Sequence, residues 1–185
     1  NITNIDNTNK IITYEPTLES DKLYTIIYDI KDSTINKNII DIQTLSFTTG
    51  DYTAPLFIPA SSTPVNESTN IDPSELIKLK FNESIKIGTT GNITIKKTND
   101  ATYSDPILIT LSANISINVD EVIVTPITAL VNSTSYYLEI DSTVIEDLST
   151  NSNFYPGITG LNGYKFTTKT IFISSTPLHN ATNID

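Results

Sequence analysis

Apolar and polar residues alternate over much of the chain between residues 51 and 169. In "ELIKLKF" (75–81), Ile77, Leu79 and Phe81 alternate with polar residues, which is typical of a strand with one buried and one solvated face. Three further segments have the same period of two: "NITIKK" (92–97), "PILITLS" (106–112) and "SYYLEI" (135–140). These patterns predict β-strands, and no comparable stretch has a helical period.

A hairpin is predicted in "ISINVDEVIVTP" (115–126), where Ile115, Ile117 and Val119 lead to a turn at Asp120-Glu121 before the chain returns. With "LFIP" opening the unit and "YKFTT" closing it, about seven short strands follow one another between turn-forming residues. This spacing predicts an all-β fold in which two antiparallel sheets pack as a sandwich. A single helical turn near 141–148 is the only helix that we expect.

The chain repeats parts of itself. "SSTPVNESTNID" begins at Ser61, and "SSTPLHNATNID" begins 113 residues later, at Ser174. Further matching pairs follow in the same order: 13–32 with 125–147, Tyr24 with Tyr136, and Phe47–Thr49 with Phe166–Thr168. An offset of this size is too long for a solenoid repeat and fits one ordinary domain.

The order of these repeats predicts three parts. Residues 1–50 are expected to form the C-terminal part of one repeat, and residues 51–170 a complete repeat. Residues 171–185 are expected to start a following repeat or to form a linker.

Composition and charge exclude several classes of protein. The chain has no cysteine, so neither disulfides nor thiolate metal sites are possible. Its net charge is −10, and all 11 basic residues are lysines, which argues against nucleic acid and anionic lipid as partners. No apolar run is long enough for direct membrane insertion. An acidic surface of this kind attracts divalent cations, although it also simply keeps extracellular repeats soluble.

Several short motifs follow one another in an order that resembles a known family. They are "TAP" (53–55), "FNESI" (81–85), "GNITI" (91–95), "VIVTP" (122–126), "ALVNSTSYYLEI" (129–140), "EDLSTN" (146–151) and "YKFTT" (164–168). In this order they resemble the bacterial Ig-like repeat of S-layer proteins. The resemblance covers 51–169, and its second half recurs over 11–49.

The resemblance implies an Ig-like antiparallel β-sandwich. It also implies a repeated building block of an extracellular cell-surface assembly, such as an S-layer, an adhesin stalk or a surface filament. The expected partners are neighbouring repeats of the same chain and other copies of it.

The sequence departs from the family pattern in the loop after residue 147. Thr150 occupies a position where the family pattern has glycine, and Ile35 occupies the matching position of the first copy. Ser84 stands where the pattern has proline. The loop 149–163 is also long for the family. Such an insertion is either a contact surface or neutral drift.

Calcium is the metal that the candidate ligands would suit. Calcium takes carboxylate and carbonyl oxygens, and it commonly stiffens junctions between extracellular domains. The candidates are Asp51, Glu83, Asp147 and Asn151, with Asp32 and Asn36 at the matching positions of the first copy. No stretch has the spacing of a known calcium loop. The alternative is that these residues cap turns and lie in solvent.

A carbohydrate-binding or adhesive module is the alternative function. Such modules stack flat aromatic rings on sugars, and this chain has no tryptophan. Most tyrosines fall at inward strand positions. Tyr137, on the outer face of its strand, and Tyr155, in the long loop, are the aromatic residues expected to be available to a glycan or a cell-surface receptor.

Asparagine glycosylation is a further possibility that the sequence raises. The acceptor pattern occurs at Asn1, Asn66, Asn82, Asn92, Asn114, Asn132 and Asn180. A chain this rich in asparagine, serine and threonine reaches a similar number by chance, so the pattern has little weight.

No catalytic motif of a hydrolase, kinase or zinc protease is present, and the single histidine is His179. Paired carboxylates could still hydrolyse a glycoside, which the 21 acidic residues leave open. The sequence therefore predicts a protein that is not an enzyme.

Overall fold

The computed structural model of the chain describes residues 2–6, 11–31, 39–108 and 113–170. It divides into two compact units. Unit 1 comprises Asn1–Thr53 and Ser149–Asn151, and unit 2 comprises Ala54–Leu148 and Ser152–Asp185. The predictions for Asp32, Asn36, Asn1, Asn180 and residues 171–185 lie outside the described residues.

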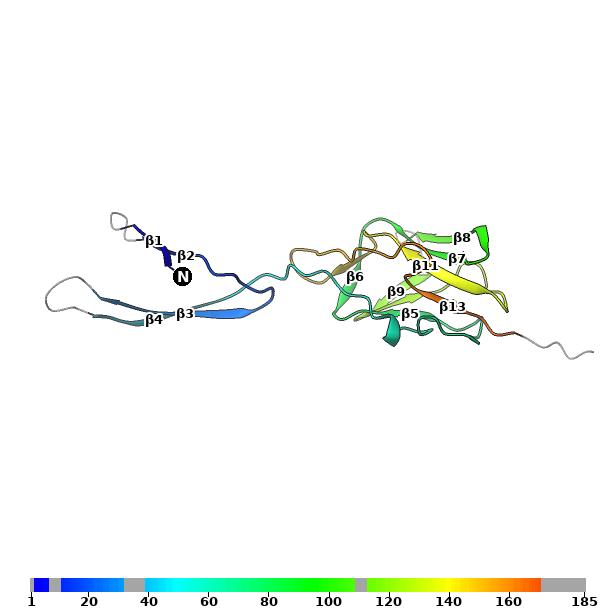
Figure 1. Ribbon diagram of the computed structural model, residues 1–185, viewed down its shortest axis with the longest axis horizontal. Helices are drawn as coiled ribbons and strands as arrows, with labels where there is room; N and C mark the ends of the chain where they lie inside the picture. The colour runs from blue at the N-terminus through cyan, green and yellow to red at the C-terminus, as the bar shows by residue number, and fades with distance from the viewer. Residues whose placement is uncertain (1, 7–10, 32–38, 109–112, 171–185) are drawn as a thin grey trace, which may run out of the picture. The chain divides into compact units, whose positions relative to one another are not determined.

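Unit 2 contains two main antiparallel sheets, drawn in green to orange in Figure 1. The four-stranded sheet has the order β13 (Lys165–Thr167), β11 (Ser135–Ile140), β7 (Asn92–Lys97) and β8 (Asp100–Leu108). The three-stranded sheet has the order β5 (Ile77–Lys80), β10 (Glu121–Val124) and β9 (Ile115–Asn118). A third, short pair joins β6 (Ile85–Ile87) to β12 (Ile145–Asp147).

The core of unit 2 is built by alternate residues of these strands. Tyr136, Leu138 and Ile140 of β11 are at most 1% exposed, while the residues between them are partly exposed. Inward residues of β5, β7 and β10 join the same cluster: Ile77, Leu79, Ile93, Ile95, Val122 and Val124. Burial of this many apolar side chains between two sheets is the main stabilising contribution to such a fold. The predicted all-β sandwich is confirmed.

Four local expectations need correction. Residues Ile145–Asp147 form a fully buried strand and not a helical turn, because Ile145 is drawn into the core. Strand β8 begins at Asp100, six residues before the predicted segment. The opening segment contributes one bridge, between Phe57 and Phe81, and is followed by a 3-10 turn, η1 (Pro59–Ser61). Val119 lies in the hairpin turn and is 66% exposed.

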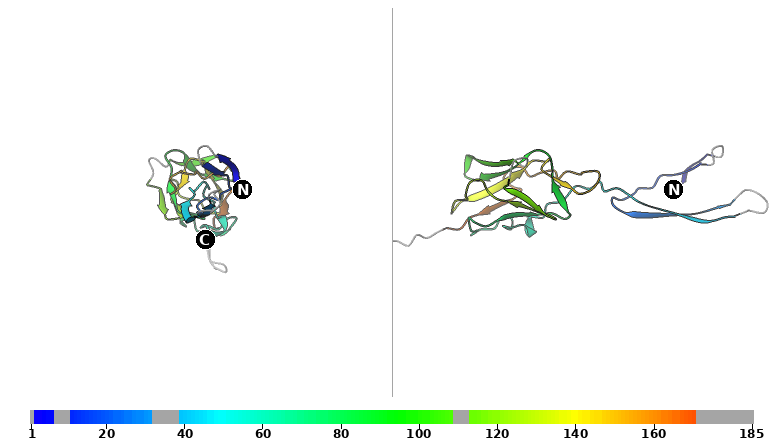
Figure 2. Two further views of the ribbon diagram at one scale, coloured as in Figure 1. Left: turned by 90° about the vertical axis from the view of Figure 1, so that its left-hand side faces the viewer. Right: turned by 180° about the vertical axis from the view of Figure 1, so that it is seen from behind.

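Unit 1 contains two antiparallel pairs, drawn in blue to cyan in Figure 1. They are β1 (Ile2–Asp6) with β2 (Ile11–Tyr14), and β3 (Leu23–Lys31) with β4 (Ile39–Thr48). The β3 and β4 strands form a long two-stranded ribbon, which is also visible in Figure 2. In the described part of the chain, no helix has the length and apolar character that a membrane crossing needs.

A network around Tyr136 ties the start of β11 to the end of β13. The Tyr136 hydroxyl accepts a hydrogen bond from the Val131 N–H at 2.9 Å, five residues earlier. The Thr168 hydroxyl donates to the carbonyl oxygens of Val131 at 2.6 Å and Thr134 at 3.1 Å, and it accepts from the Thr134 N–H at 3.0 Å. Ser133 completes the turn with a φ of 54°. This arrangement is a tyrosine corner of the kind found in β-sandwiches.

Unit 1 contains the same corner at equivalent positions. The Tyr24 hydroxyl accepts from the Glu19 N–H at 2.8 Å, again five residues earlier. The Thr49 hydroxyl donates to the Glu19 carbonyl oxygen at 2.7 Å and accepts from the Lys22 N–H at 2.9 Å. Asp21 has a φ of 50°, close to the 54° of Ser133 in unit 2.

The strand register at the two corners is also the same. Tyr24 pairs with Phe47, and Tyr136 pairs with Phe166. The ring centroids are 5.9 Å apart in both pairs. The repeat seen in the sequence therefore corresponds to a repeated local structure.

Replacing Tyr136 by phenylalanine tests the corner. We expect Tyr136→Phe to lower the free energy of unfolding by about 1–2 kcal/mol, because the Val131 N–H loses its partner while the buried ring is kept. Chemical denaturation of the full chain measures this. Tyr137→Phe, on the other face of the same strand, is the control and should change stability by less than about 0.5 kcal/mol. Equal effects of the two substitutions would contradict the assigned role.

The turn between β9 and β10 carries backbone strain. Val119 has a φ of 58°, a region that β-branched residues rarely occupy. The turn is held there because the carbonyl oxygens of Val119 and Asp120 accept hydrogen bonds from Ile85 N (2.9 Å) and Phe81 N (2.8 Å).

Val119→Gly should therefore stabilise unit 2 by about 1 kcal/mol, because glycine adopts positive φ without the clash of a branched side chain. A rise in the unfolding midpoint would be the readout. Val65→Gly is the control: Val65 is also exposed but lies outside the positive-φ region, so this change should have the opposite sign. Destabilisation by Val119→Gly would show that the turn is not strained.

Candidate functional site

Two of the predicted metal ligands lie together in unit 2, where β6 pairs with β12. Asp147 is opposite Ile85 in this pair, and Glu83 precedes Ile85 by two residues. A carboxylate oxygen of Glu83 lies within 4.8 Å of one of Asp147. Glu83 is partly buried, and Asp147 is only 1% exposed. Two acidic groups are thus held at one place by strand pairing.

The segment before Glu83 is fixed by Asn82. Its side-chain oxygen accepts a hydrogen bond from the Leu56 N–H at 2.6 Å, and its own N–H donates to the Leu56 carbonyl oxygen at 3.0 Å. These two bonds join the end of β5 to the opening segment of unit 2. The backbone next to Glu83 is therefore positioned independently of any ligand.

Asp147 has hydrogen-bonding partners within its own loop. Its two carboxylate oxygens accept from the Asn153 N–H at 3.1 Å and from the Asn153 side-chain amide at 2.7 Å. The Asp147 N–H donates in turn to the Asn153 carbonyl oxygen at 3.1 Å. Asp147 therefore closes the loop between β12 and Asn153, which explains why a charged residue is tolerated at a buried position.

Asp51 and Asn151 are brought together in unit 1. The Asn151 side-chain amide donates to the Asp51 carbonyl oxygen at 2.8 Å. The Asp51 carboxylate accepts from the Thr53 N–H (2.9 Å), the Thr53 hydroxyl (2.7 Å) and the Ser20 hydroxyl (3.0 Å). The Thr53 N–H above all, then the two hydroxyls, hold the pKa of Asp51 below its usual value. Asp51 thus has the geometry of a turn-capping acid, and its carbonyl oxygen serves as an acceptor.

The glycine missing from this loop is compensated at another position. Thr150 does not have a positive φ; Ser152 does, at 50°. Gly157 has a φ of 93°, and a Cβ there would lie 2.4 Å from the Ile140 carbonyl oxygen. The loop therefore keeps its left-handed turns, although they are not where the family pattern places them.

The long loop 149–163 packs on the sandwich for part of its length. Ile158 and Ile140 exchange two backbone hydrogen bonds of 2.9 Å each, and the Gly160 N–H donates to the Glu139 side chain at 3.1 Å. The Tyr155 N–H donates to the Ile145 carbonyl oxygen at 2.8 Å. At these positions the loop packs against the core, although Phe154 and Leu161 remain exposed.

Tyr155 is not available as a stacking platform. Its side chain is 8% exposed, and its ring lies 5.2 Å from that of Phe81 and 6.5 Å from that of Phe57, between ring centroids. Burial raises the pKa of Tyr155 to about 12. The expected exposure of Tyr155 is therefore wrong, because the loop folds this residue into the core.

Tyr137 lies on the outer face of the four-stranded sheet, as expected. It is partly exposed, and it pairs across the strands with Lys96 on one side and Lys165 on the other. Lys96 is bound to Glu139 at 2.6 Å. A single ring between charged side chains is a small surface for binding a sugar.

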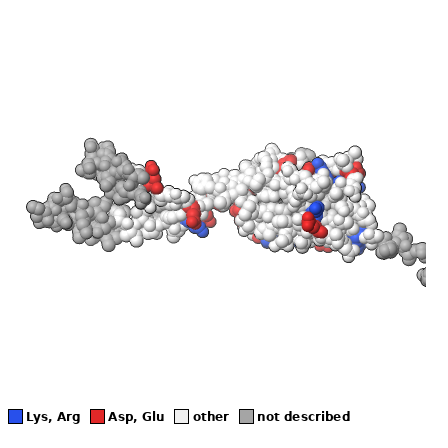
Figure 3. Space-filling view, viewed as in Figure 1, with Lys and Arg blue, Asp and Glu red and all other residues white. Residues whose placement is uncertain are grey.

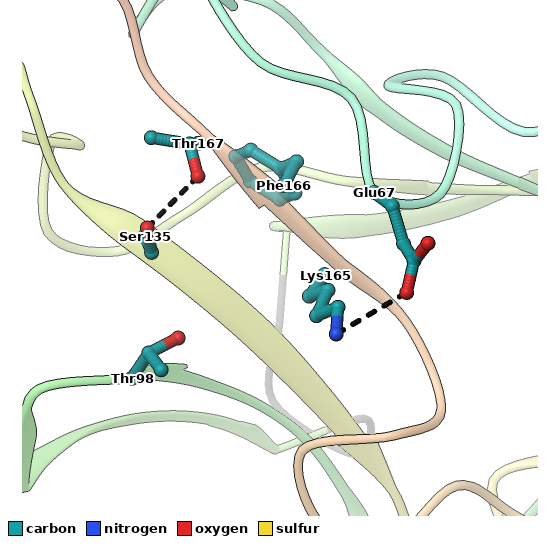
Figure 4. Close-up of a pocket in the computed structure, with 6 residues that line it drawn as sticks. All are labelled: Glu67, Thr98, Ser135, Lys165, Phe166 and Thr167. Carbon is teal, nitrogen blue, oxygen red and sulfur yellow. Dashed lines mark hydrogen bonds and ion pairs between the residues drawn. The ribbon is translucent and has the colours of Figure 1, made fainter.

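A cavity of about 200 Å³ opens on the same outer face (Figure 4). Its lining residues are Glu67, Thr98, Ser135, Lys165, Phe166 and Thr167. Glu67 binds Lys165 at 3.2 Å, and the hydroxyls of Ser135 and Thr167 are 2.8 Å apart. The sequence has no motif at this cavity, and its only signal there is the polar outward positions of β11 and β13. The polar side chains that line the cavity bind mainly each other, so few polar groups remain to bind a ligand.

Five lysines in the described residues of unit 2 form ion pairs with acidic groups. The closest pairs are Lys80 with Asp120 (2.7 Å), Lys96 with Glu139 (2.6 Å), and Lys169 with Asp72. On the face drawn in Figure 3, basic and acidic atoms occur in small groups among uncharged residues. On this face the described basic residues do not form a continuous patch.

The described glycosylation candidates are partly or fully exposed. Two of them use the amide nitrogen that would carry a glycan: Asn92 donates to Asp141 at 3.4 Å, and Asn114 donates to the Thr125 carbonyl oxygen at 2.9 Å. The side-chain oxygen of Asn66 accepts from the Lys165 N–H at 2.9 Å. The remaining described candidates are Asn82 and Asn132.

Residues 51–168 match the bacterial Ig-like domain family. No curated protein and no solved structure matches the chain. Domains of this family are typically found in surface or extracellular bacterial proteins and are generally non-enzymatic. The match covers both main sheets of unit 2, the Glu83–Asp147 pair and the tyrosine corner at Tyr136. The chain belongs to the bacterial Ig-like domain family.

Proposed function

We propose that this chain is a non-enzymatic structural segment of an extracellular bacterial assembly in which Ig-like repeats follow one another. The observation that carries the proposal is the duplicated tyrosine corner. Tyr24 and Tyr136 make equivalent hydrogen bonds to the backbone five residues earlier, and the threonines at 49 and 168 close both turns. Two copies of such a corner in one chain favour tandem modules over an unrelated N-terminal extension.

The polar surface supports a structural role. In unit 2 the acidic and basic side chains near β11 and β13 bind each other, and the cavity between them holds one ion pair and one hydroxyl pair. A binding module would present donors, acceptors or aromatic rings to a partner. With Tyr155 in the core, the carbohydrate-binding alternative keeps only Tyr137 among the aromatic residues on which it depended.

The proposed assembly is an S-layer, an adhesin stalk or a surface filament. All three use repeated sandwiches as building blocks, and the partners are neighbouring repeats and other copies of the chain. The short segments "GDYTAP" and "KTIFISSTP" each contain a proline, which limits bending between modules.

Electron microscopy of a longer recombinant array tests this proposal. We expect regularly spaced modules that form rods or lattice patches, because short proline-containing connections leave few residues free to bend. A lattice would favour an S-layer, and isolated rods a stalk or filament. Flexible beads that never associate would contradict the structural role and would make screening against glycans the next step.

Calcium binding by Asp51, Glu83, Asp147 and Asn151 stays a prediction, which the closeness of the Glu83 and Asp147 carboxylates supports. Calcium in millimolar excess should raise the unfolding temperature of the full chain, because an ion that binds only the folded state stabilises it, and a chelator should reverse the rise. Differential scanning calorimetry measures both.

Matched variants separate a specific site from general screening of the acidic surface. Glu83→Gln should remove most of the increase with calcium. The control, Glu67→Gln, removes one negative charge from another part of unit 2, where Glu67 pairs with Lys165. This variant should keep the increase in unfolding temperature with calcium. An unfolding temperature that does not change with calcium would rule out a stabilising site, and equal loss in both variants would assign the effect to net charge.

A further inference from the structure

One face of the β3–β4 ribbon in unit 1 is apolar and exposed. Cross-strand pairing puts Tyr24, Ile26, Leu45 and Phe47 on this face, with Tyr28 next along β3. Ile26 is 38% exposed, Tyr28 41% and Leu45 55%, while Tyr24 and Phe47 stack on each other. An apolar surface of this kind on a two-stranded ribbon is not stable by itself in water.

The equivalent face in unit 2 is completely covered. From the shared corner, Tyr24 corresponds to Tyr136, Ile26 to Leu138, and Phe47 to Phe166. Leu45 and Tyr28 correspond to Tyr164 and Ile140. All five residues of unit 2 are at most 2% exposed, in one cluster with the inward residues of β5 and β10.

The free edge of β3 gives a second, independent indication. In unit 2, β11 lies between β13 and β7, and it pairs with β7 from Tyr136 to Ile140. In the described residues of unit 1, β3 pairs with β4 alone. Among the residues that the structure describes in unit 1, no strand meets the edge of β3 that a β7-like strand would occupy, and such an edge is open to strand addition.

We propose that the β3–β4 ribbon is an acceptor for the first half of an Ig-like repeat, a segment of the type formed by Ala54–Val124 in unit 2. This segment supplies a β7-like strand to the free edge of β3. It also supplies β5- and β10-like strands, whose alternate isoleucine, leucine and valine side chains cover Tyr24, Ile26 and Phe47. The inference rests on the repeat architecture proposed above.

The shape and chemistry of unit 2 favour this occupant over a second copy of the ribbon. The covering sheet in unit 2 carries Ile77, Leu79, Val122 and Val124 against the aromatic residues of β11 and β13. Two ribbons packed face to face would cover the aromatic residues but would not add a strand to β3. Only a segment that contains a β7-like strand together with β5- and β10-like strands can both pair with the edge of β3 and cover the apolar face.

Joining a second copy of Ala54–Val124 to Asn1 of the full chain tests the proposal. Amide hydrogen exchange, followed residue by residue, should become at least about tenfold slower in β3 and β4 than in the unmodified chain. A second calorimetric unfolding transition should accompany the slower exchange.

Two neighbouring residues of β3 provide matched variants. Ile26 lies on the apolar face and corresponds to the buried Leu138, whereas Ile27 lies on the other face, is 68% exposed and corresponds to Glu139. In the extended chain, Ile26→Lys should abolish the slower exchange of β3 and β4, and Ile27→Lys should keep it. If both variants keep it, the face that contains Ile26 is not the acceptor.

Other results would overturn the proposal. Unchanged exchange in β3 and β4, with the amides of unit 2 protected as before, would show that this segment does not complete the ribbon. Dimerisation of the unmodified chain, measured by sedimentation and abolished by Ile26→Lys, would assign the face to a second copy. Neither result depends on whether longer arrays form rods or lattices, so failure of this inference is distinguishable from failure of the proposed structural role.

Discussion

Burial of one face of β11 is the constraint on which the rest of unit 2 depends. Tyr136, Leu138 and Ile140 lose nearly all contact with water, which requires a second sheet opposite them and a paired strand on each side. Apolar burial of this extent is the largest favourable contribution to folding. The β3–β4 ribbon carries the same pattern of side chains, but the described residues of unit 1 form no covering sheet, and Ile26, Tyr28 and Leu45 remain exposed.

The tyrosine corner connects this core to the turns at its end. Because Tyr136 is buried, its hydroxyl needs a partner, and the Val131 N–H of the preceding loop provides one. Thr168 then bonds both Val131 and Thr134, so that the loop, β11 and the end of β13 form one hydrogen-bonded unit. Tyr24 and Thr49 make the equivalent hydrogen bonds in unit 1, although Tyr24 is only partly buried, so the corner does not depend on complete burial of its ring.

The loop after β12 shows how one residue can serve both structure and a candidate site. Asp147 is buried because it binds Asn153 with both carboxylate oxygens, and this closure directs the chain back towards Tyr155 and the core. Glu83 comes near it through the pairing of β6 with β12. The acidic pair therefore arises from strand pairing that the fold needs in any case, so its geometry alone does not require a metal.

The sequence alone determined the strands with a clear period of two and most of their inward residues, and it matched Tyr24 with Tyr136 and Phe47–Thr49 with Phe166–Thr168, because these follow from local alternation and from matching positions in two copies. It also named Glu83 and Asp147 among the candidate calcium ligands. Only the tertiary structure decided the three-residue strands β6 and β12, the burial of Tyr155 and the positive φ of Val119. These features depend on contacts between residues far apart in the chain: β6 and β12, for example, are separated by about sixty residues. A strand of three residues is also too short to show an alternation of apolar and polar positions in the sequence. The local pattern of residues specifies which face of a strand is buried. Which segment packs against that face is decided only by the tertiary structure.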